Sequence, residues 1–212
     1  MKYLFLILIY ASLKANSQEL PPKMETYIRK ETFRICKVLN VPIRENITKD
    51  APLKIMQNNN FFALNAVFAV GKSTDIVGDE TDSARYYLRP RIWLSPICFN
   101  VAAKITDTSK SIYFQAMGGI IHEFTHYIQA SVTPQWLYFY PQRMDSINMN
   151  KYVSQIVEFE SHAVEAYYYL ENINRKKLKE IMHSNDGMDG KFKLLINEYF
   201  LETKPWRKFK VF

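Results

Sequence analysis

The sequence predicts an α+β protein, with strands in the N-terminal half and helices in the C-terminal half. Two apolar runs rich in aromatic and β-branched residues, 61–70 and 84–96, have the composition of strands. From residue 111 onwards, apolar residues recur instead at the spacing of amphipathic helices. The 212 residues suffice for one domain with a hydrophobic core, and a hydrophobic content of 48% excludes a disordered chain.

Residues 1–17 have the pattern of a secretory signal peptide. A lysine precedes a short apolar run, and the small-x-small cleavage pattern "ANS" precedes Gln18. A buried strand or an uncleaved anchor is the alternative, although the run is shorter than an ordinary membrane span. We therefore expect a mature chain that forms a single domain over 18–212 and is secreted or periplasmic.

The N-terminal half contains one predicted helix and two predicted strands. The helix, 23–40, follows two prolines and carries its apolar residues on one face. The first strand, 61–70, ends at a polar loop. The second, 84–96, contains Pro90, which cannot donate a backbone hydrogen bond and therefore favours an edge position or a bend. The signals between residues 42 and 60 are mixed and predict no element.

The C-terminal half is predicted to contain four helices. The first spans 111–132, and a proline-bounded aromatic loop, 134–146, follows it. A long helix then covers about 148–172, and shorter helices cover 175–183 and 191–203. No internal repeat and no interdomain linker interrupt this order.

The charge of the chain gives no sign of a nucleic-acid partner. The formal net charge is +7, and it falls to +5 without the signal peptide, which holds two lysines and no acid. No arginine-rich run with interleaved aromatic residues is present, and the cluster Arg175-Lys176-Lys177 with Lys179 is typical of a solvated helix face. We expect no membrane partner after signal cleavage.

The two cysteines, Cys36 and Cys98, leave two interpretations open. In an oxidising compartment they could form a disulfide, but spacing cannot establish that. Either could equally be a small buried hydrophobic residue. Neither belongs to a Cys-x-x-Cys pair, so a thiolate metal site is not indicated.

The segment "IIHEFTHYIQ" carries the strongest chemical signal. His122 and His126 are four residues apart, so both imidazoles lie on one face of the predicted helix and can bind one zinc ion. Zinc lowers the pKa of a bound water towards about 7, and Glu123 is placed to take its proton without occupying a coordination position. The alternative is a chance match in a helix with a few polar residues.

The setting of the motif favours a metal site over a chance match. Apolar residues surround the three polar ones, so the helix is expected to pack in the core. Two histidines and a glutamate buried there would be costly without a purpose. Gly118 and Gly119 lie inside the same helix, where glycine lowers stability, so we expect them to permit close backbone packing.

A catalytic zinc needs a third protein ligand and keeps one position open. One branch of zinc peptidases supplies this ligand by extending the motif to His-Glu-x-x-His-x-x-Gly-x-x-His. This chain has Gln129 and Val132 at the last two defining positions, so that branch is excluded. The third ligand must come from another segment.

The next long predicted helix is the best source of that ligand. Glu158, His162 and Glu165 lie at positions i, i+4 and i+7, on one stripe of the helix, whereas Glu160 points about 200° away from Glu158. Glu158 and Glu165 are about 10 Å apart along the helix axis, so both can hardly touch one ion. One glutamate facing two histidines completes a His-His-Glu site.

Taken together, "HEFTHYIQ" and the later "EFESHAVEAYYYL" resemble the gluzincin-type zinc metallopeptidases. The resemblance implies a zincin-like core, with His122 and His126 as zinc ligands, Glu123 as the base and Glu158 as the third ligand. In that family, an Asp or Asn four residues after the third ligand orients a zinc histidine. His162 stands at this position, so it could orient a ligand, bind metal itself or be a core histidine.

The resemblance implies an exported peptidase that hydrolyses peptide bonds of a protein or peptide substrate with zinc as its cofactor. Glu123 would take a proton from the attacking water and pass it to the leaving amine. Two alternatives stay open: a zinc amidase that acts on cell-wall peptides, and a non-catalytic zinc-scaffold binding protein. An intact Glu123 argues against the second, because metal binding alone does not require it.

Substrate contacts are less well specified by the sequence. In this family an edge strand beside the cleft binds extended peptide, and 84–96 is the first candidate, with 61–70 as the alternative. An oxyanion is often stabilised by a Tyr or His from another element, but Tyr138, Tyr140 and Tyr152 are each better explained as packing residues. His183 is expected to be a surface histidine.

Overall fold

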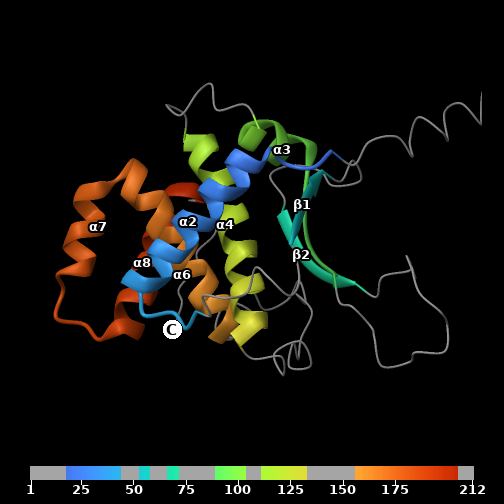
Figure 1. Ribbon diagram of the computed structural model, residues 1–212. Coiled ribbons are helices and arrows are strands. Elements are labelled where there is room, and N and C mark those ends of the chain that lie inside the picture. Colours follow the sequence, from blue (N-terminus) through green and yellow to red (C-terminus); the bar gives the residue numbers. More distant parts are fainter. Residues whose placement is uncertain are drawn as a thin grey trace, which may run out of the picture.

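The computed structural model describes residues 18–43, 53–57, 66–71, 89–103, 111–132 and 156–204. Within these ranges the protein is mostly helical with one small sheet, which agrees with the predicted α+β class (Figure 1). The predicted signal peptide, the aromatic loop 134–146, Tyr152 and the first part of the helix predicted from residue 148 lie outside the described ranges.

Five helices of the described ranges follow predicted segments. Helix α4 spans Ser111–Val132, with the predicted bounds, and α2 spans Pro22–Val38. The C-terminal half continues with α6 (Ile156–Ile173), α7 (Arg175–Met182) and α8 (Met188–Thr203). The helical spacing of apolar residues was therefore sufficient to locate these elements.

The sheet has the strand order β1 (Lys54–Gln57), β3 (Arg89–Leu94), β2 (Ala66–Gly71). Strand β1 is parallel to β3, and β2 is antiparallel to it. Of the two alternatives predicted for the segment with Pro90, an edge position or a bend, the edge position is wrong, because β3 is the central strand of the described sheet. Proline is tolerated there because the ladder with β1 begins only at Arg91, so among the described residues Pro90 has a paired strand on one side alone.

Two elements have no counterpart among the predictions. Strand β1 is only four residues long, too short for a periodic pattern. Helix α3 (Pro96–Ala103) does carry a local start signal, because the Ser95 hydroxyl accepts a hydrogen bond from the Cys98 backbone N–H at 3.2 Å and proline suits the first helical position. Strand β2 covers the second half of the predicted strand 61–70.

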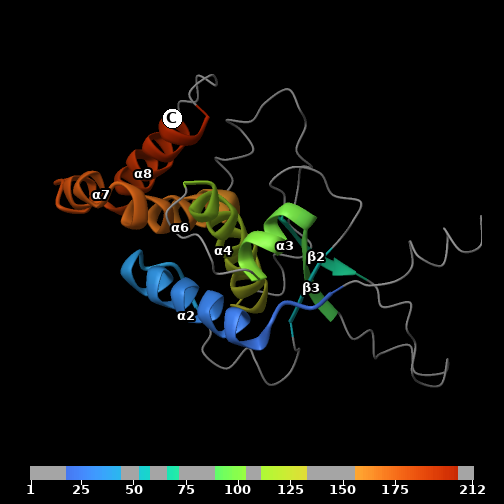
Figure 2. The ribbon, with the colours of Figure 1, turned by 90° about the horizontal axis from the view of Figure 1, so that it is seen from above.

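Helix α4 lies between the sheet and the remaining long helices (Figures 1 and 2). It packs against β2 and β3 on one side and against α2 and α6 on others. Four apolar side chains in its middle are fully buried in the core that these elements share, namely Ile120, Ile121, Phe124 and Ile128. Polar side chains on this helix therefore need polar partners within the protein.

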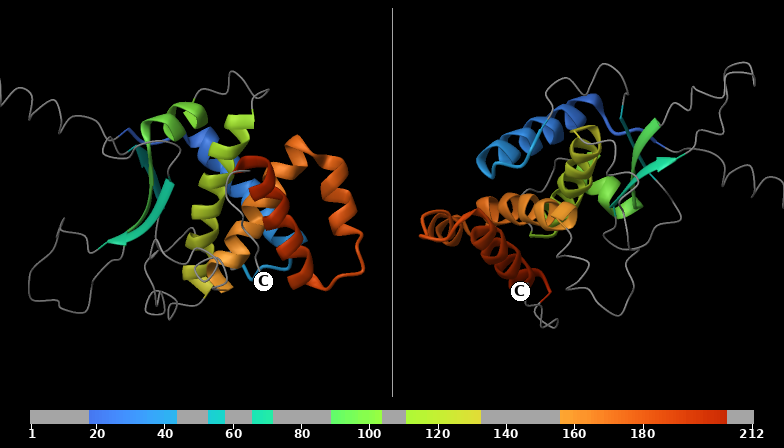
Figure 3. Two further views of the ribbon diagram at one scale, coloured as in Figure 1. Left: turned by 180° about the vertical axis from the view of Figure 1, so that it is seen from behind. Right: turned by 90° about the horizontal axis from the view of Figure 1, so that it is seen from below.

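The C-terminal helices α7 and α8 pack against α6. Helix α8 packs against α6, and α7 packs against both, on the side of α4 that faces away from the sheet (Figure 3).

The two outer edges of the sheet differ in whether another described segment pairs with them. Residues 18–20 cover the outer edge of β1 by backbone hydrogen bonds, whereas no other described segment pairs with the outer edge of β2.

Three minor expectations can be compared with the described residues. Cys36 and Cys98 are both buried in the reduced form, which agrees with their interpretation as small hydrophobic residues. His183 is exposed, as expected, and its Nδ1 lies 2.8 Å from the Lys179 carbonyl oxygen. Among the helices in the described ranges, none is long and apolar enough to span a bilayer.

Candidate metal centre

Helices α4 and α6 bring two histidines and one glutamate together inside the protein. The Nε2 atoms of His122 and His126 lie 3.0 Å apart. Each lies 3.4 Å from a carboxylate oxygen of Glu158, which projects from the facing helix. Glu158 is completely buried and both histidines are 6% exposed. The three side chains form a group able to hold a metal ion.

The chemistry of these three groups favours a cation between them. Two Nε2 atoms that face each other at 3.0 Å repel unless a proton or a metal lies near both lone pairs. A buried carboxylate also needs a positive partner, since burial of an isolated charge is costly. A divalent metal satisfies all three groups at once, because neutral imidazole and carboxylate are both metal ligands.

Hydrogen bonds to Gln129 fix the ring of His126. The Gln129 Nε2 group donates to the Val157 carbonyl oxygen at 3.1 Å and to Glu160 at 2.9 Å, and both of these partners can only accept. This identifies Oε1 as the atom that lies 3.0 Å from His126 Nδ1. An amide oxygen only accepts, so Nδ1 carries the proton and Nε2 keeps its lone pair for a metal.

Ser161 completes the support of His126. Its hydroxyl donates to Gln129 Oε1 at 3.2 Å and also lies 3.2 Å from His126 Nδ1. Glu160, on the same helix, contacts Gln129 and not the metal-binding group, which agrees with its predicted direction away from Glu158. Gln129 therefore orients the His126 ring. In the sequence, this residue had served only to exclude the longer zinc motif, which requires a glycine at its position.

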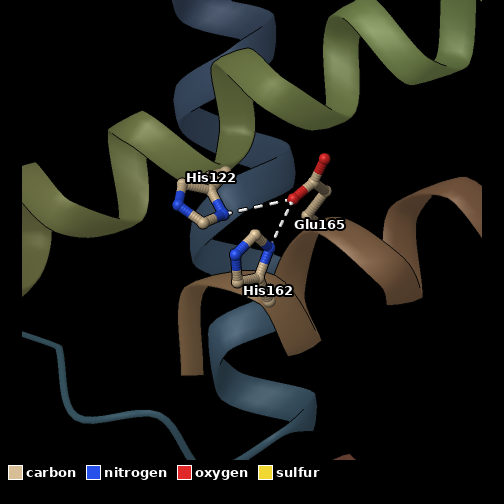
Figure 4. Close-up of side chains that lie close together, drawn as sticks. All are labelled: His122, His162 and Glu165. Atoms are coloured by element: carbon tan, nitrogen blue, oxygen red, sulfur yellow. Dashed lines mark hydrogen bonds and ion pairs between the residues drawn. The ribbon is translucent and has the colours of Figure 1, made fainter. Parts of the chain in front are cut away.

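A second carboxylate, that of Glu165, lies beside the other nitrogen of His122. Its Oε2 is 3.2 Å from His122 Nδ1 and 3.0 Å from His162 Nδ1, as Figure 4 shows. Its Oε1 accepts a hydrogen bond from the Tyr199 hydroxyl of α8 at 2.6 Å. His122, His162 and Glu165 thus form a second group that shares His122 with the first.

The electrostatics keep both carboxylates ionised. Burial alone would raise the pKa of Glu158, but the His122 and His126 rings beside the carboxylate outweigh burial and hold that pKa well below its usual range. Burial is likewise outweighed at Glu165, where His122 and His162 lower the pKa. Burial would lower the pKa of His122, but the Glu158 and Glu165 carboxylates outweigh burial and hold that pKa well above its ordinary value.

His162 and Tyr199 remain neutral next to Glu165. Burial, followed by the nearby charge of His122, lowers the pKa of His162. Burial and the Glu165 carboxylate raise the pKa of Tyr199 well above the ordinary value of a phenol. Tyr199 therefore keeps its proton and donates it to the hydrogen bond with Glu165.

The structure brings the predicted metal ligands together and adds one contact, between Glu165 and His122, that the sequence did not predict. His122, His126 and Glu158 lie together as expected, and Glu123 follows His122 on α4 with its side chain only partly buried. His162 lies beside the site, with Nε2 4.0 Å from Glu158 Oε2 and its ring centroid 4.4 Å from that of His122.

Two of the supporting residues differ in how far the sequence could have revealed them. Gln129 is three residues after His126, on the same helix face, so helical geometry alone could have suggested the contact. Tyr199 lies on a helix far along the chain, and no local pattern connects it to Glu165. Tyr138, Tyr140 and Tyr152, considered for an oxyanion, lie outside the described residues.

Gly118 explains how Glu165 approaches α4 so closely. A Cβ atom at this position would lie 3.3 Å from Glu165 Cγ and 3.7 Å from its carbonyl oxygen. A Cβ atom at Gly119 would meet nothing within 4 Å. The expected close packing is therefore confirmed at Gly118 and not at Gly119.

Comparison of the chain with protein-family models, with curated proteins and with solved structures gave no match in any of the three. The function considered next is therefore argued from the site itself. Its central features are the facing Nε2 atoms of His122 and His126, the buried Glu158 carboxylate, the hydrogen bond that orients the His126 ring, and the Glu165 carboxylate 3.2 Å from His122 Nδ1.

Proposed function

We propose that the protein is an exported zinc-dependent metallopeptidase, with zinc held by His122, His126 and Glu158. The observation that carries this proposal is the spacing of the three donor groups, 3.0, 3.4 and 3.4 Å. Ligand atoms about 2.0–2.1 Å from a tetrahedral zinc ion are roughly 3.4 Å from each other. The donor set of two imidazoles and one carboxylate is also that of catalytic zinc sites in known peptidases.

In this proposal, different residues bind zinc, transfer the proton and orient the zinc ligands. Zinc, when bound, lowers the pKa of a water molecule towards about 7 and polarises a carbonyl group. Glu123 follows a ligand on α4 and is more accessible than the ligands, so it can accept a proton from the attacking water and return it to the leaving amine. Gln129 accepts from Nδ1 of His126, and Glu165 is placed 3.2 Å from Nδ1 of His122, where it can accept that proton once zinc occupies Nε2.

Three protein ligands leave a position for substrate, which distinguishes a catalytic site from a structural one. His162 is the one further histidine near the group in the described residues, with Nε2 4.0 Å from Glu158 Oε2. Its Nδ1 is engaged with Glu165. If His162 were a fourth ligand, the site would be closed, and the alternative of a non-catalytic zinc-binding protein would follow.

The position of the sheet supports a peptide substrate. Helix α4 packs against β2 and β3, and β2 is an antiparallel edge strand of the described sheet. Its outer edge can bind an extended peptide by main-chain hydrogen bonds. The second candidate for the substrate strand, 61–70, thus replaces 84–96, whose strand is central. This arrangement supports the proposed zincin-like core.

The direct test is a cleavage assay on the purified chain from residue 18 onwards. A broad peptide library, with cell-wall peptides as a separate arm, is incubated with the protein before and after treatment with a chelator. We expect cleavage that is lost with the chelator and restored by about one equivalent of zinc. Cleavage of only the cell-wall arm would indicate the amidase, and bound zinc without any cleavage would contradict the enzymatic proposal.

Export has its own test. The predicted cleavage site precedes Gln18, so the protein recovered from the medium or periplasm should begin near this residue. N-terminal sequencing of that material checks the prediction. Recovery of the full-length chain in the cytoplasm alone would contradict it.

A further inference from the structure

We propose that Glu165 is the residue that positions the zinc ligand His122, and that it does so as a hydrogen-bond acceptor held by Tyr199 and His162. The inference rests on the proposed zinc site. It assigns different roles to two overlapping groups that share His122: the first, with His126 and Glu158, binds metal, and the second, with His162 and Glu165, supports it.

The shared histidine cannot serve both groups as a metal ligand. Nε2 of His122 lies 3.0 Å from His126 Nε2 and 3.4 Å from Glu158, whereas Nδ1 lies 3.2 Å from Glu165. A neutral imidazole has one lone pair and one N–H. If Nε2 binds the metal, Nδ1 carries the proton and faces a carboxylate, the arrangement that fixes the orientation of zinc-bound histidines.

Glu165 is well suited to accept this proton because its own position is fixed. It is 8% exposed, and it accepts two hydrogen bonds, from the Tyr199 hydroxyl at 2.6 Å and from His162 Nδ1 at 3.0 Å. Its Oε2 also lies 3.2 Å from His122 Nδ1, a buried nitrogen that has no other acceptor in the described residues. A carboxylate accepts several hydrogen bonds and needs no metal to balance them. Gly118 leaves the space on α4 that brings the Glu165 side chain against that helix.

The role of Glu165 also accounts for the histidine at position 162. Nδ1 of His162 donates to Glu165 and therefore has no lone pair to accept a proton from His122 Nδ1. Glu165 lies beside both rings and contacts the Nδ1 atom of each, as seen in Figure 4. His162 thus holds Glu165 through Nδ1 and packs against the His122 ring, so we assign it as a positioning residue and not as a ligand.

The experiment measures zinc stoichiometry and affinity by titration for the wild-type chain and for four single variants. Glu165→Gln keeps the size but removes the charge, and we expect one zinc per chain with affinity lowered about 10–100-fold. Tyr199→Phe and His162→Ala should each lower affinity by a smaller factor. Glu171→Gln is the matched control, because it makes the same change on α6 at a residue that pairs with Arg34 instead; its affinity should equal that of wild type.

A spectroscopic readout separates positioning from general loss of structure. In the zinc-loaded protein the buried Nδ1–H of His122 should give an exchange-protected low-field proton signal. That signal should shift or vanish in Glu165→Gln, and it should be retained in Glu171→Gln. Circular dichroism confirms that each variant is folded, and Tyr199→Phe, which removes a single oxygen, provides the test if Glu165→Gln does not fold.

Different results would overturn different parts of the account. Wild-type affinity in Glu165→Gln, with an unchanged proton signal, would overturn the role of Glu165 and leave the proposed peptidase intact. Two zinc ions per chain, with one lost in Glu165→Gln, would make the second group a metal site. A His162→Ala variant with no measurable zinc binding would make His162 a ligand. Absence of zinc binding in wild type would overturn the proposed function and this inference together.

Discussion

Nδ1 of His122 lies 3.2 Å from Oε2 of Glu165, while Nε2 of the same ring lies 3.4 Å from Oε2 of Glu158. One imidazole is therefore held between two carboxylates of the same helix. The glutamates are seven residues apart, about 10 Å along the helix axis, so they contact opposite nitrogens of the ring. This arrangement gives the two acids separate tasks, one as a ligand and one as a support.

Gln129 should be as important for the second histidine as Glu165 is for the first. Gln129→Leu keeps the volume but removes the acceptor at 3.0 Å from His126 Nδ1 and the donor to Val157. We expect about 10–100-fold weaker zinc binding. The buried carbonyl of Val157 loses its partner as well, which should cost about 1–3 kcal/mol of stability in the metal-free protein. Zinc titration and urea unfolding measure the two effects, and unchanged zinc affinity would contradict this role.

The two adjacent glycines of α4 offer a matched pair of substitutions. Both changes to alanine gain helix propensity, worth about 0.8–1.0 kcal/mol in a helix interior. Gly119→Ala meets nothing within 4 Å and should stabilise the protein with zinc affinity unchanged. Gly118→Ala places a Cβ 3.3 Å from Glu165 Cγ, so it should gain less stability and weaken zinc binding. Equal zinc affinity in the two variants would show that Glu165 does not depend on this contact.

The Cys36 thiol should be almost unreactive in the folded protein. Burial, with the charge of Glu160 second, raises its pKa from 9.0 to about 12. At pH 8 the thiolate fraction is then about 10³-fold smaller than in the unfolded chain. A Cys98→Ala variant isolates Cys36 for labelling with a thiol reagent, with and without denaturant. Labelling of the folded protein at the unfolded rate would contradict the prediction.

The same shift makes the contribution of Cys36 to stability dependent on pH. Its pKa is higher in the folded state, so between about 9 and about 12 the folded protein binds more protons than the unfolded chain. Stability from this group is therefore complete below pH 9 and falls as the pH rises. A smaller alkaline loss in Cys36→Ala than in wild type, measured by urea unfolding, is the expected result.

Glu123 is the predicted proton acceptor, so its replacement should separate chemistry from metal binding. Glu123→Gln keeps the shape of the side chain and leaves His122, His126 and Glu158 in place. We expect hydrolysis to fall by about 10²–10⁴-fold while zinc content stays at the wild-type level. Peptide cleavage rates and metal analysis on the same preparation check both halves, and undiminished cleavage would contradict the mechanism.

Sequence periodicity predicted the long helices but neither the short helix α3 nor the details of the sheet. The bounds of α4 follow from apolar spacing and from the proline that comes after it. The central position of β3 could not be inferred from Pro90, because only the register with β1 shows that this proline lies beyond that ladder. Strand β1 is paired through contacts that are distant in sequence, and its four residues carry no pattern of their own.

The metal-binding group was predictable because its geometry is local. His122 and His126 are joined by one turn of helix, and the stripe of Glu158 can be seen in the sequence of α6. The supporting contacts depend on tertiary packing. Tyr199 reaches Glu165 only because α8 packs against α6, and Glu165 reaches His122 only because Gly118 allows close approach of the two helices.

The most direct test of the account is metal analysis of the purified chain from residue 18 onwards, beside Glu158→Ala and Glu171→Ala. Both variants remove a carboxylate from α6, but only Glu158 faces the two Nε2 atoms. We predict about one zinc per chain in wild type and in Glu171→Ala, and severe loss in Glu158→Ala. Wild type that neither contains zinc nor takes it up, or Glu158→Ala that retains it, would contradict the assignment of this site.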